Sequence, residues 1–197
     1  MKKKLLSLTI FVITLISCSI CLLAGCMPSR PDKFIQKLLV STNWGIVQEN
    51  DKGVTSIDAR NGRIAWSKGI NGETYWVLSK DEKSVEVYRY EKGAWKYSIT
   101  NSGTDLDQLK TVFKTNATSI SVDNVNLLDV CKNFTDKYEH RDGKWYERNT
   151  QPASFYVKGS QLIYEKGNKK ATYVVGYKVE ISKEAKAAKD KYLHSHA

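Results

Sequence analysis

Alternating apolar and polar positions, broken every few residues by turn residues, run from about residue 44 to residue 99 of the chain. Because side chains of a strand point alternately to the two faces of a sheet, this period of two predicts β-strands. Later predicted strands in this region cover residues 74–79, 84–90 and 94–100. Consecutive strands joined by short turns form an antiparallel meander.

The clearest turn signal in this region is Asn61-Gly62. A two-residue type I′ loop needs a positive φ at both central positions, which asparagine and glycine tolerate best. With these residues in the loop, Ala59 pairs with Ile64 and Ile57 with Trp66. The pattern therefore predicts a hairpin with one buried, apolar face.

A period of three to four residues indicates helices in other segments. Residues 32–40 predict a first helix with one apolar face, and residues 104–115 and 123–138 predict two more. In the last of these, a predicted buried stripe consists of Val125, Leu128, Cys131, Phe134 and Tyr138. This spacing gives Cys131 a structural place in the core rather than a reactive one.

Strand patterns return near residues 144–148, 153–158, 161–166 and 171–181. The whole order predicts an α+β fold, in which antiparallel meander strands are followed by two helices and a second antiparallel strand set. Residues 182–197 carry lysines among alanines and predict a basic tail that can form a solvated helix.

The first 25 residues have a different pattern. Three lysines at positions 2–4 precede an uncharged apolar stretch, which is the layout of a secretory signal peptide. A transmembrane helix is the alternative, because about 20 apolar residues can span a bilayer. Serines and threonines dilute the stretch, however, which favours the signal peptide.

The stretch ends in Leu23-Ala24-Gly25-Cys26, which resembles the lipobox of bacterial lipoproteins. The resemblance covers the first 26 residues and implies cleavage by signal peptidase II before Cys26. It also implies a diacylglyceryl group on the Cys26 thiol, with fatty acyl chains such as palmitate as the anchor. The protein is then expected on the extracytoplasmic side of the cell membrane, held there by lipid.

This resemblance divides the chain into four parts. Residues 1–25 are the expected lipoprotein signal peptide and residues 26–31 a short tether. Residues 32–181 form a single α+β domain, and residues 182–197 are the basic tail.

Composition and charge agree with such a protein. Of the 197 residues, 41% are hydrophobic and 26% charged, as in folded domains. Cys131 is the one cysteine after Cys26, so no intrachain disulfide is expected and the core must hold the fold. The net charge of +10, less the three lysines of the signal segment, is +7. Lysine predominates over arginine, which favours anionic membrane surfaces and not a nucleic-acid partner.

Patterns that indicate catalysis are absent from the sequence. The histidines are His140, beside a predicted turn, and His194 and His196 in the tail, so none is placed to activate a nucleophile. The sequence also lacks a glycine-rich phosphate loop and a metal-ligand motif. We therefore predict no catalytic residue, no metal site and no cofactor. A lipid-anchored cell-wall enzyme that uses two carboxylates remains the alternative.

The predicted hairpin around Lys92-Gly93 carries the candidate binding residues, which are Tyr88, Tyr90, Trp95 and Tyr97. A two-residue loop places all four rings on one face and turns Val85 and Val87 to the other. Tyrosine and tryptophan provide large contact areas in protein interfaces, although such rings also fill cores or stack on sugars.

These observations predict a membrane-anchored envelope lipoprotein with a non-enzymatic binding domain. Its expected partner, besides the membrane, is a protein or peptide at the cell surface. Immunity lipoproteins against lantibiotics and exclusion lipoproteins of mobile elements are similar in size and layout. No motif of the domain itself supports either class.

Overall fold

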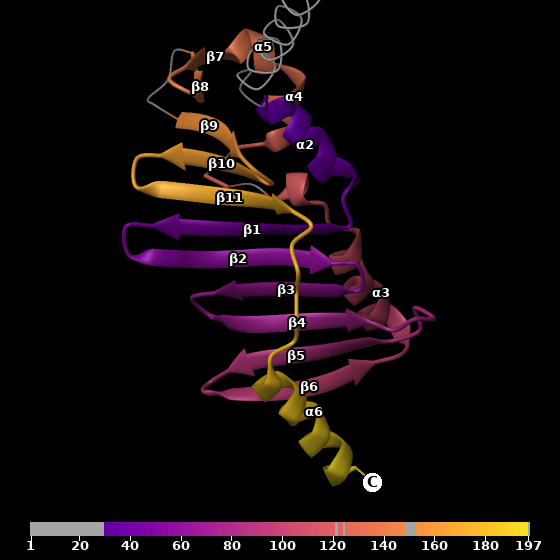
Figure 1. Ribbon diagram of the computed structural model, residues 1–197. Coiled ribbons are helices and arrows are strands. Elements are labelled where there is room, and N and C mark those ends of the chain that lie inside the picture. The colour runs from indigo at the N-terminus through magenta and orange to yellow at the C-terminus, as the bar shows by residue number, and fades with distance from the viewer. Residues whose placement is uncertain (1–29, 121, 124, 149–152, 197) are drawn as a thin grey trace, which may run out of the picture.

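A computed structural model describes residues 30–120, 122–123, 125–148 and 153–196. Its centre is one antiparallel sheet of 11 strands in the order β6-β5-β4-β3-β2-β1-β11-β10-β9-β8-β7 (Figure 1). The predicted α+β class is confirmed, as is its order of meander strands, helices and a second strand set.

The meander strands are β1 (Asn43–Asn50), β2 (Gly53–Asn61), β3 (Ile64–Gly69), β4 (Gly72–Leu78), β5 (Val85–Glu91) and β6 (Ala94–Thr100). The second set is β7 (Tyr138–Arg141), β8 (Lys144–Glu147), β9 (Ala153–Lys158), β10 (Gln161–Lys166) and β11 (Lys169–Val175). The two sets join where β1 pairs with β11, from Trp44 opposite Val175 to Glu49 opposite Lys170.

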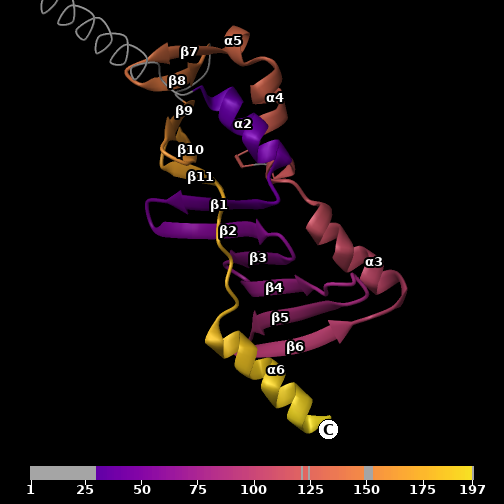
Figure 2. The ribbon, with the colours of Figure 1, turned by 45° about the vertical axis from the view of Figure 1, so that its right-hand side comes forward.

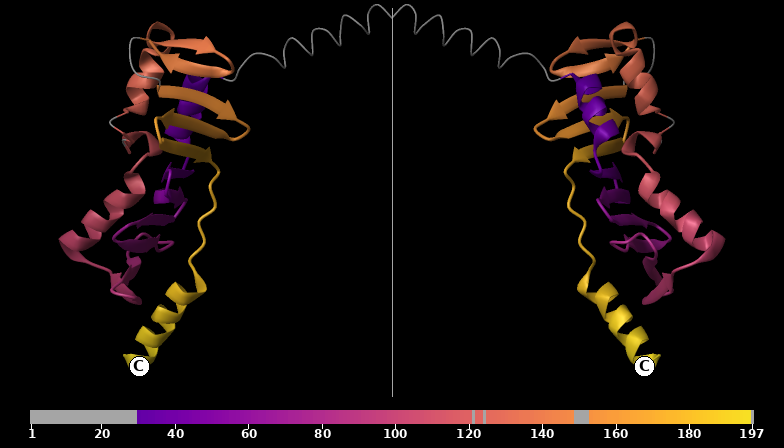
Figure 3. Two further views of the ribbon diagram at one scale, coloured as in Figure 1. Left: turned by 90° about the vertical axis from the view of Figure 1, so that its left-hand side faces the viewer. Right: turned by 90° about the vertical axis from the view of Figure 1, so that its right-hand side faces the viewer.

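The helices are α2 (Pro31–Val40), α3 (Gly103–Thr111), α4 (Leu127–Lys132), α5 (Phe134–Lys137) and α6 (Lys183–Ser195), with the 3-10 turns η1 (Val112–Lys114) and η2 (Ala117–Ser119). Helices α2 to α5 lie on one face of the sheet, here called the helical face (Figure 2). The extended segment 176–182 crosses the opposite face and leads to α6 at the β6 end, as the side views in Figure 3 show. This opposite face is called the strap face.

The core consists of three clusters that follow these two faces. The largest packs α2 and α4 against β1 and β9–β11, and includes Ile35, Leu38, Ile46, Leu127 and Tyr173. A second packs α3 and η1 against β3–β5 on the same face. The third lies on the strap face, where Val179 and Ala185 pack against Ala59, Tyr75 and Tyr88.

Because the side chains of a strand alternate between the two faces of the sheet, β1 contributes residues to both faces. Trp44 and Ile46 of β1 are buried on the helical face, and Gly45 between them points to the strap face. A Cβ atom on Gly45 would lie 2.5 Å from the ring of Tyr177. Glycine is therefore needed here so that the strap can lie close to the sheet.

The β2–β3 hairpin corrects one predicted register. Ala59 pairs with Trp66 and Asn61 with Ile64, so the loop is Gly62-Arg63 and not Asn61-Gly62. The Gly62 amide donates to the side-chain oxygen of Asn43 at 2.8 Å, which anchors the loop one residue later. Moving the loop by one residue shifts the partner of each β2 residue by two positions along β3. Because the two faces alternate with a period of two, the same residues still share a face. The prediction of a single buried face is also wrong, because Ala65 is buried on the helical face.

The predicted helix over 123–138 is broken. Asp123 has a φ of +51°, which no α-helix accommodates, and Asn126 caps α4 by accepting from the amide of Leu128 at 2.9 Å. A second interruption at Asn133 separates α4 from α5, and Tyr138 already belongs to β7. The buried positions are consequently Leu127, Val130, Phe134 and Tyr138, whereas the predicted Val125, Leu128 and Cys131 are half-buried.

The C-terminal part also differs from its predictions. The strand predicted over 171–181 ends at Val175, and the chain then leaves the sheet as the strap. The helix predicted in the tail is present as α6, with Ser182 as its cap, but it is not solvated on all sides. Ala185 is fully buried against the sheet, so α6 is part of the fold.

Candidate functional site

The aromatic hairpin forms with the predicted register. Tyr88 pairs with Tyr97 and Tyr90 with Trp95. The loop residues Lys92 and Gly93 both have positive φ, at +50° and +83°, as a type I′ turn requires. The opposite face of β5 carries Val85 and Val87 as predicted, and both are buried beneath α3 and η1.

The rings of the hairpin continue into a longer array, which we call the aromatic ladder. Its members are Trp66, Tyr75, Tyr88, Tyr90, Trp95 and Tyr97, with centroid distances of 5.9 Å for Trp66–Tyr75, 5.7 Å for Tyr75–Trp95, 5.4 Å for Tyr90–Trp95 and 5.2 Å for Tyr88–Tyr97. The sequence interpretation missed the two members on β3 and β4. Counting outward from the turn at residues 70–71 pairs them directly, so the signal was present.

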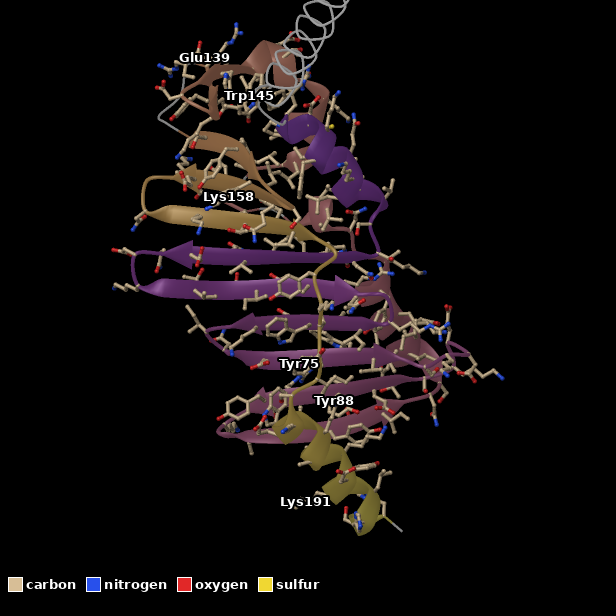
Figure 4. All side chains as sticks on the ribbon, viewed as in Figure 1. Tyr75, Tyr88, Glu139, Trp145, Lys158 and Lys191 are labelled. Carbon is tan, nitrogen blue, oxygen red and sulfur yellow. The ribbon has the colours of Figure 1, made fainter. Side chains whose placement is uncertain are left out.

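The strap and α6 cover most of this ladder. Tyr88 is 3% exposed and belongs to the third core cluster, and Figure 4 shows it with Tyr75 near the start of α6. Tyr97 is half-buried, and the ring of Tyr192 in α6 lies 5.2 Å from it. Tyr90 is 39% exposed, and its half-buried neighbour Trp95 lies at the same end. Among the four candidate residues, Tyr88 is therefore buried, Trp95 and Tyr97 are half-buried, and Tyr90 is exposed.

Two glutamates satisfy the polar atoms of the covered part. Glu73 accepts from the Tyr75 hydroxyl at 2.8 Å and from the Trp66 indole at 3.0 Å. Glu86 accepts from the Tyr88 hydroxyl at 2.7 Å and from the Lys189 ammonium of α6 at 2.7 Å. These contacts give each buried donor of the covered part a carboxylate oxygen as its acceptor.

The pKa shifts agree with this arrangement. Burial first, and then the neighbouring Glu86 carboxylate, raise the pKa of Tyr88 and bring the pKa of Tyr97 to about 12. Burial opposes the charged form of Glu86, but hydrogen bonds from Lys189 and Tyr88 outweigh it and hold the pKa of Glu86 below 4.5. The contact between α6 and the sheet therefore depends on an ionised glutamate.

Replacing Lys189 with methionine is expected to loosen α6. Amide hydrogen exchange in α6 should accelerate about fivefold, as expected for the loss of about 1 kcal/mol of ion pairing. Because the folded pKa of Glu86 is lowered, its stabilisation is present above pH 4.5 and lost as the pH falls through the folded value. Relative to the intrinsic, base-catalysed exchange rate at each pH, acidification should thus lower the protection of the α6 amides in the wild type more than in Lys189→Met. Lys186→Met, at an exposed position of the same helix, is the control, and equal exchange rates in the two variants would contradict the role of Lys189.

A second candidate site is a polar pocket of about 380 Å³ on the helical face, between α4 and strands β8–β10. Its lining includes the carboxylates Asp123, Asp129 and Glu147 and the phenols of Tyr138 and Tyr164. Asp123 forms ion pairs with Lys169 at 2.6 Å and with Lys166 at 3.2 Å. These carboxylates are the groups that the predicted alternative, a carboxylate enzyme, would use for catalysis.

The electrostatics of this pocket do not favour acid catalysis. Hydrogen bonds from Lys169 and Lys166 outweigh desolvation and lower the pKa of Asp123. Burial raises the pKa of Tyr138, and burial together with the Asp123 charge raises that of Tyr164 to about 12. A glycosidase acid needs a raised carboxyl pKa, whereas Asp123 is shifted the opposite way. Asp123 therefore serves in this pocket as the acidic partner of two lysines.

Cys131 lies between α4 and α2, half-buried beside the largest cluster. Its thiol donates to the backbone carbonyl oxygen of Asp32 at a sulfur–oxygen distance of 3.6 Å. Replacement by alanine is expected to lower the free energy of unfolding by about 1–2 kcal/mol and to leave partner binding intact. Urea titration and thiol labelling of the native protein measure this, and rapid native labelling would indicate a reactive thiol instead.

The histidines lie apart from both candidate sites. His140 is exposed on β7 beside the ring of Trp145, at a centroid distance of 5.0 Å. In α6, Nδ1 of His194 lies 2.7 Å from the carbonyl oxygen of Asp190, and Nδ1 of His196 lies 2.9 Å from that of Tyr192. Within the described ranges, histidine, cysteine and acidic side chains do not gather into a group of three that suits a metal ion.

Cys26 and the remaining lipobox residues lie outside the described residues, as does the whole predicted signal peptide. Across the part of the chain that the structure describes, no helix has the length and apolarity to cross a membrane. In comparisons with known proteins, no family model matches this chain, and no curated protein matches it either.

Proposed function

We propose that the protein is a lipid-anchored envelope protein on the extracytoplasmic side of the cell membrane, with a non-enzymatic domain that binds a protein or peptide. The lipobox ending at Cys26 supports the anchor. The open end of the aromatic ladder supports the binding function, because Tyr90 and Trp95 combine contact area with partial exposure.

The position of these rings strengthens the proposal. Strand β6 has a neighbour on one side only, and its seven residues contain neither a proline nor a break in register. The opposite edge strand, β7, has four residues and carries the ion pair between Glu139 and Arg141. Strand β6 also carries an ion-paired lysine, Lys96 with Glu91, so the two edges differ in length. A short edge resists pairing with other chains, whereas a long regular edge accepts an added strand. The binding surface is therefore assigned to Tyr90, Trp95 and the β6 edge.

The observation that carries this assignment is the exposure of Tyr90 at 39% in a ladder whose other tyrosines are more deeply covered. Immunity and exclusion lipoproteins remain the classes to which such a protein is compared. In the polar pocket, Asp123 is held in ion pairs with Lys166 and Lys169, which does not favour the carboxylate alternative.

A photo-crosslinking amino acid in place of Tyr90 tests the binding surface in intact cells of the native host. A discrete adduct with one surface protein is expected, because Tyr90 lies beside the open edge. The control places the same amino acid at Tyr146, a half-buried tyrosine of β8 at the other end of the sheet. Adducts from the Tyr146 position alone would contradict the assignment.

Trp95→Ala supplies the matching affinity measurement with the captured protein. Binding should weaken by about 2 kcal/mol or more, while the melting temperature stays close to that of the wild type. The reverse pattern, in which stability falls by about 3–5 kcal/mol and affinity is unchanged, would make Trp95 a core residue only.

A further inference from the structure

A pocket of about 560 Å³ lies at the other end of the molecule, between α2 and the β9–β10 turn. Its lining consists of Arg30, Lys33, Phe34, Lys37, Val157, Gly159, Ser160 and Val175. Arg30 is the N-cap of α2, and Lys33 and Lys37 lie within this helix, so one element supplies three cations. Neither aspartate nor glutamate is among the lining residues. The pocket therefore combines positive charge with an apolar interior.

The three cations of the pocket differ in whether an acidic side chain already compensates their charge. Asp32 binds the Arg30 guanidinium through two contacts, at 3.0 and 2.9 Å, so that this charge is compensated. Lys33 and Lys37 are exposed, and within the described residues neither forms an ion pair. They are four positions apart on α2 and so lie on the same side of the helix. Two like charges this close are relieved by an anion between them.

The apolar residues of the lining limit the chemical class of ligand that the pocket can bind. Phe34 is buried in the largest cluster, and the half-buried Val157 and Val175 pack against the same cluster. A fully hydrated inorganic ion gains nothing from such a surface, whereas the phosphate of a phospholipid is joined to a diacylglycerol and so has an apolar part beside its charge. A phosphodiester headgroup of an anionic phospholipid has this combination.

The sequence places this pocket near the expected anchor. Cys26 lies four residues before Arg30, and an extended chain spans at most about 14 Å over four residues. A lysine near an anionic bilayer contributes about 1 kcal/mol of attraction within roughly one Debye length. We propose that the pocket of Lys33 and Lys37 binds the phosphodiester headgroup of an anionic phospholipid. This inference rests on the proposed lipid anchor, and it assigns the α2 end of the domain to the membrane surface.

Photo-crosslinking with a phosphatidylglycerol analogue that carries a reactive headgroup tests the site. The full chain, purified from membranes, is reconstituted into phosphatidylcholine vesicles with the analogue, and adducts are mapped by mass spectrometry. Adducts are expected in residues 30–37 and 157–160. Lys33→Gln with Lys37→Gln should reduce their yield about tenfold or more, since two lysines contribute about 1 kcal/mol each.

The control is Lys92→Gln with Lys186→Gln, which removes the same charge at the β6 end of the sheet and should leave the yield unchanged. Equal losses in the two double variants, or adducts spread over the whole domain, would overturn the proposal. Complete competition by inorganic phosphate would also overturn it, because the site would then bind free phosphate. An unprocessed chain with adducts at the pocket would contradict the anchor alone, whereas a processed chain without them would contradict the pocket alone.

Discussion

Truncation of Tyr173 to alanine is expected to lower the free energy of unfolding by about 3–5 kcal/mol. The Tyr173 side chain is 0% exposed and lies in the largest cluster. It belongs to β11, which pairs with β1 on one side and β10 on the other. The cavity would therefore open at the joint between the two strand sets, where the sheet depends on contacts between distant parts of the chain.

Two phenylalanine variants separate ring packing from hydrogen bonding. The Tyr173 hydroxyl is buried and has no hydrogen-bond partner among the described residues, so Tyr173→Phe should leave stability unchanged or slightly higher. The matched variant Tyr88→Phe removes the bond to Glu86 and should cost about 1.5–3 kcal/mol, as for bonds to charged groups. Urea unfolding of the full chain in mild detergent measures both. If Tyr173→Phe lowered the free energy of unfolding as much as Tyr88→Phe does, the Tyr173 hydroxyl would have a hydrogen-bond partner.

Replacement of Cys26 by alanine is expected to abolish processing and lipid attachment. In the proposed anchor, transfer of the diacylglyceryl group needs a thiol at this position, and each buried methylene group of the chains contributes about 0.8 kcal/mol to membrane binding. The variant should keep residues 1–25 and lose its label from radioactive palmitate. Its remaining membrane attachment, if any, would come from the unprocessed apolar segment.

Cys21→Ala is the matched control for this variant. It removes a thiol from the same segment, five residues before Cys26, and should be processed and labelled normally. Normal labelling of Cys26→Ala, or loss of labelling in Cys21→Ala, would contradict the assignment of Cys26 as the lipidated residue.

Local patterns were sufficient to predict most of the sheet. The β5–β6 register follows from the loop Lys92-Gly93, because both residues adopt the positive φ that a two-residue turn needs. The β2–β3 loop was misplaced by one residue, because the side chain of Asn43 binds the Gly62 amide. That contact joins residues 19 positions apart and has no local signature in the sequence.

Contacts between distant residues explain the other differences. The pairing of β1 with β11 unites the two strand sets, and no turn signal predicts it because more than a hundred residues separate the strands. The same holds for α6, which is held by the contact of Lys189 with Glu86. A lysine-rich and alanine-rich segment is typical of a solvated helix, so the covering of Tyr88 and Tyr97 was not predictable from the tail alone.

The candidate site was therefore predicted in part. The four rings share one face as the alternation predicts, and the sequence left core burial and an open face as alternatives. The structure divides them, because α6 covers Tyr88 and packs on Tyr97 but leaves Tyr90 exposed. Charge patterning indicated attraction to anionic surfaces, whereas the pocket beside α2 depends on how the β9–β10 turn packs and has no sequence signal.

The intact mass of the protein purified from membranes of its host tests the central claim most directly. The account predicts one species whose chain begins at Cys26 and carries the added mass of a diacylglyceryl group. A species that retains residues 1–25 and has no lipid on Cys26 would contradict the proposed anchor.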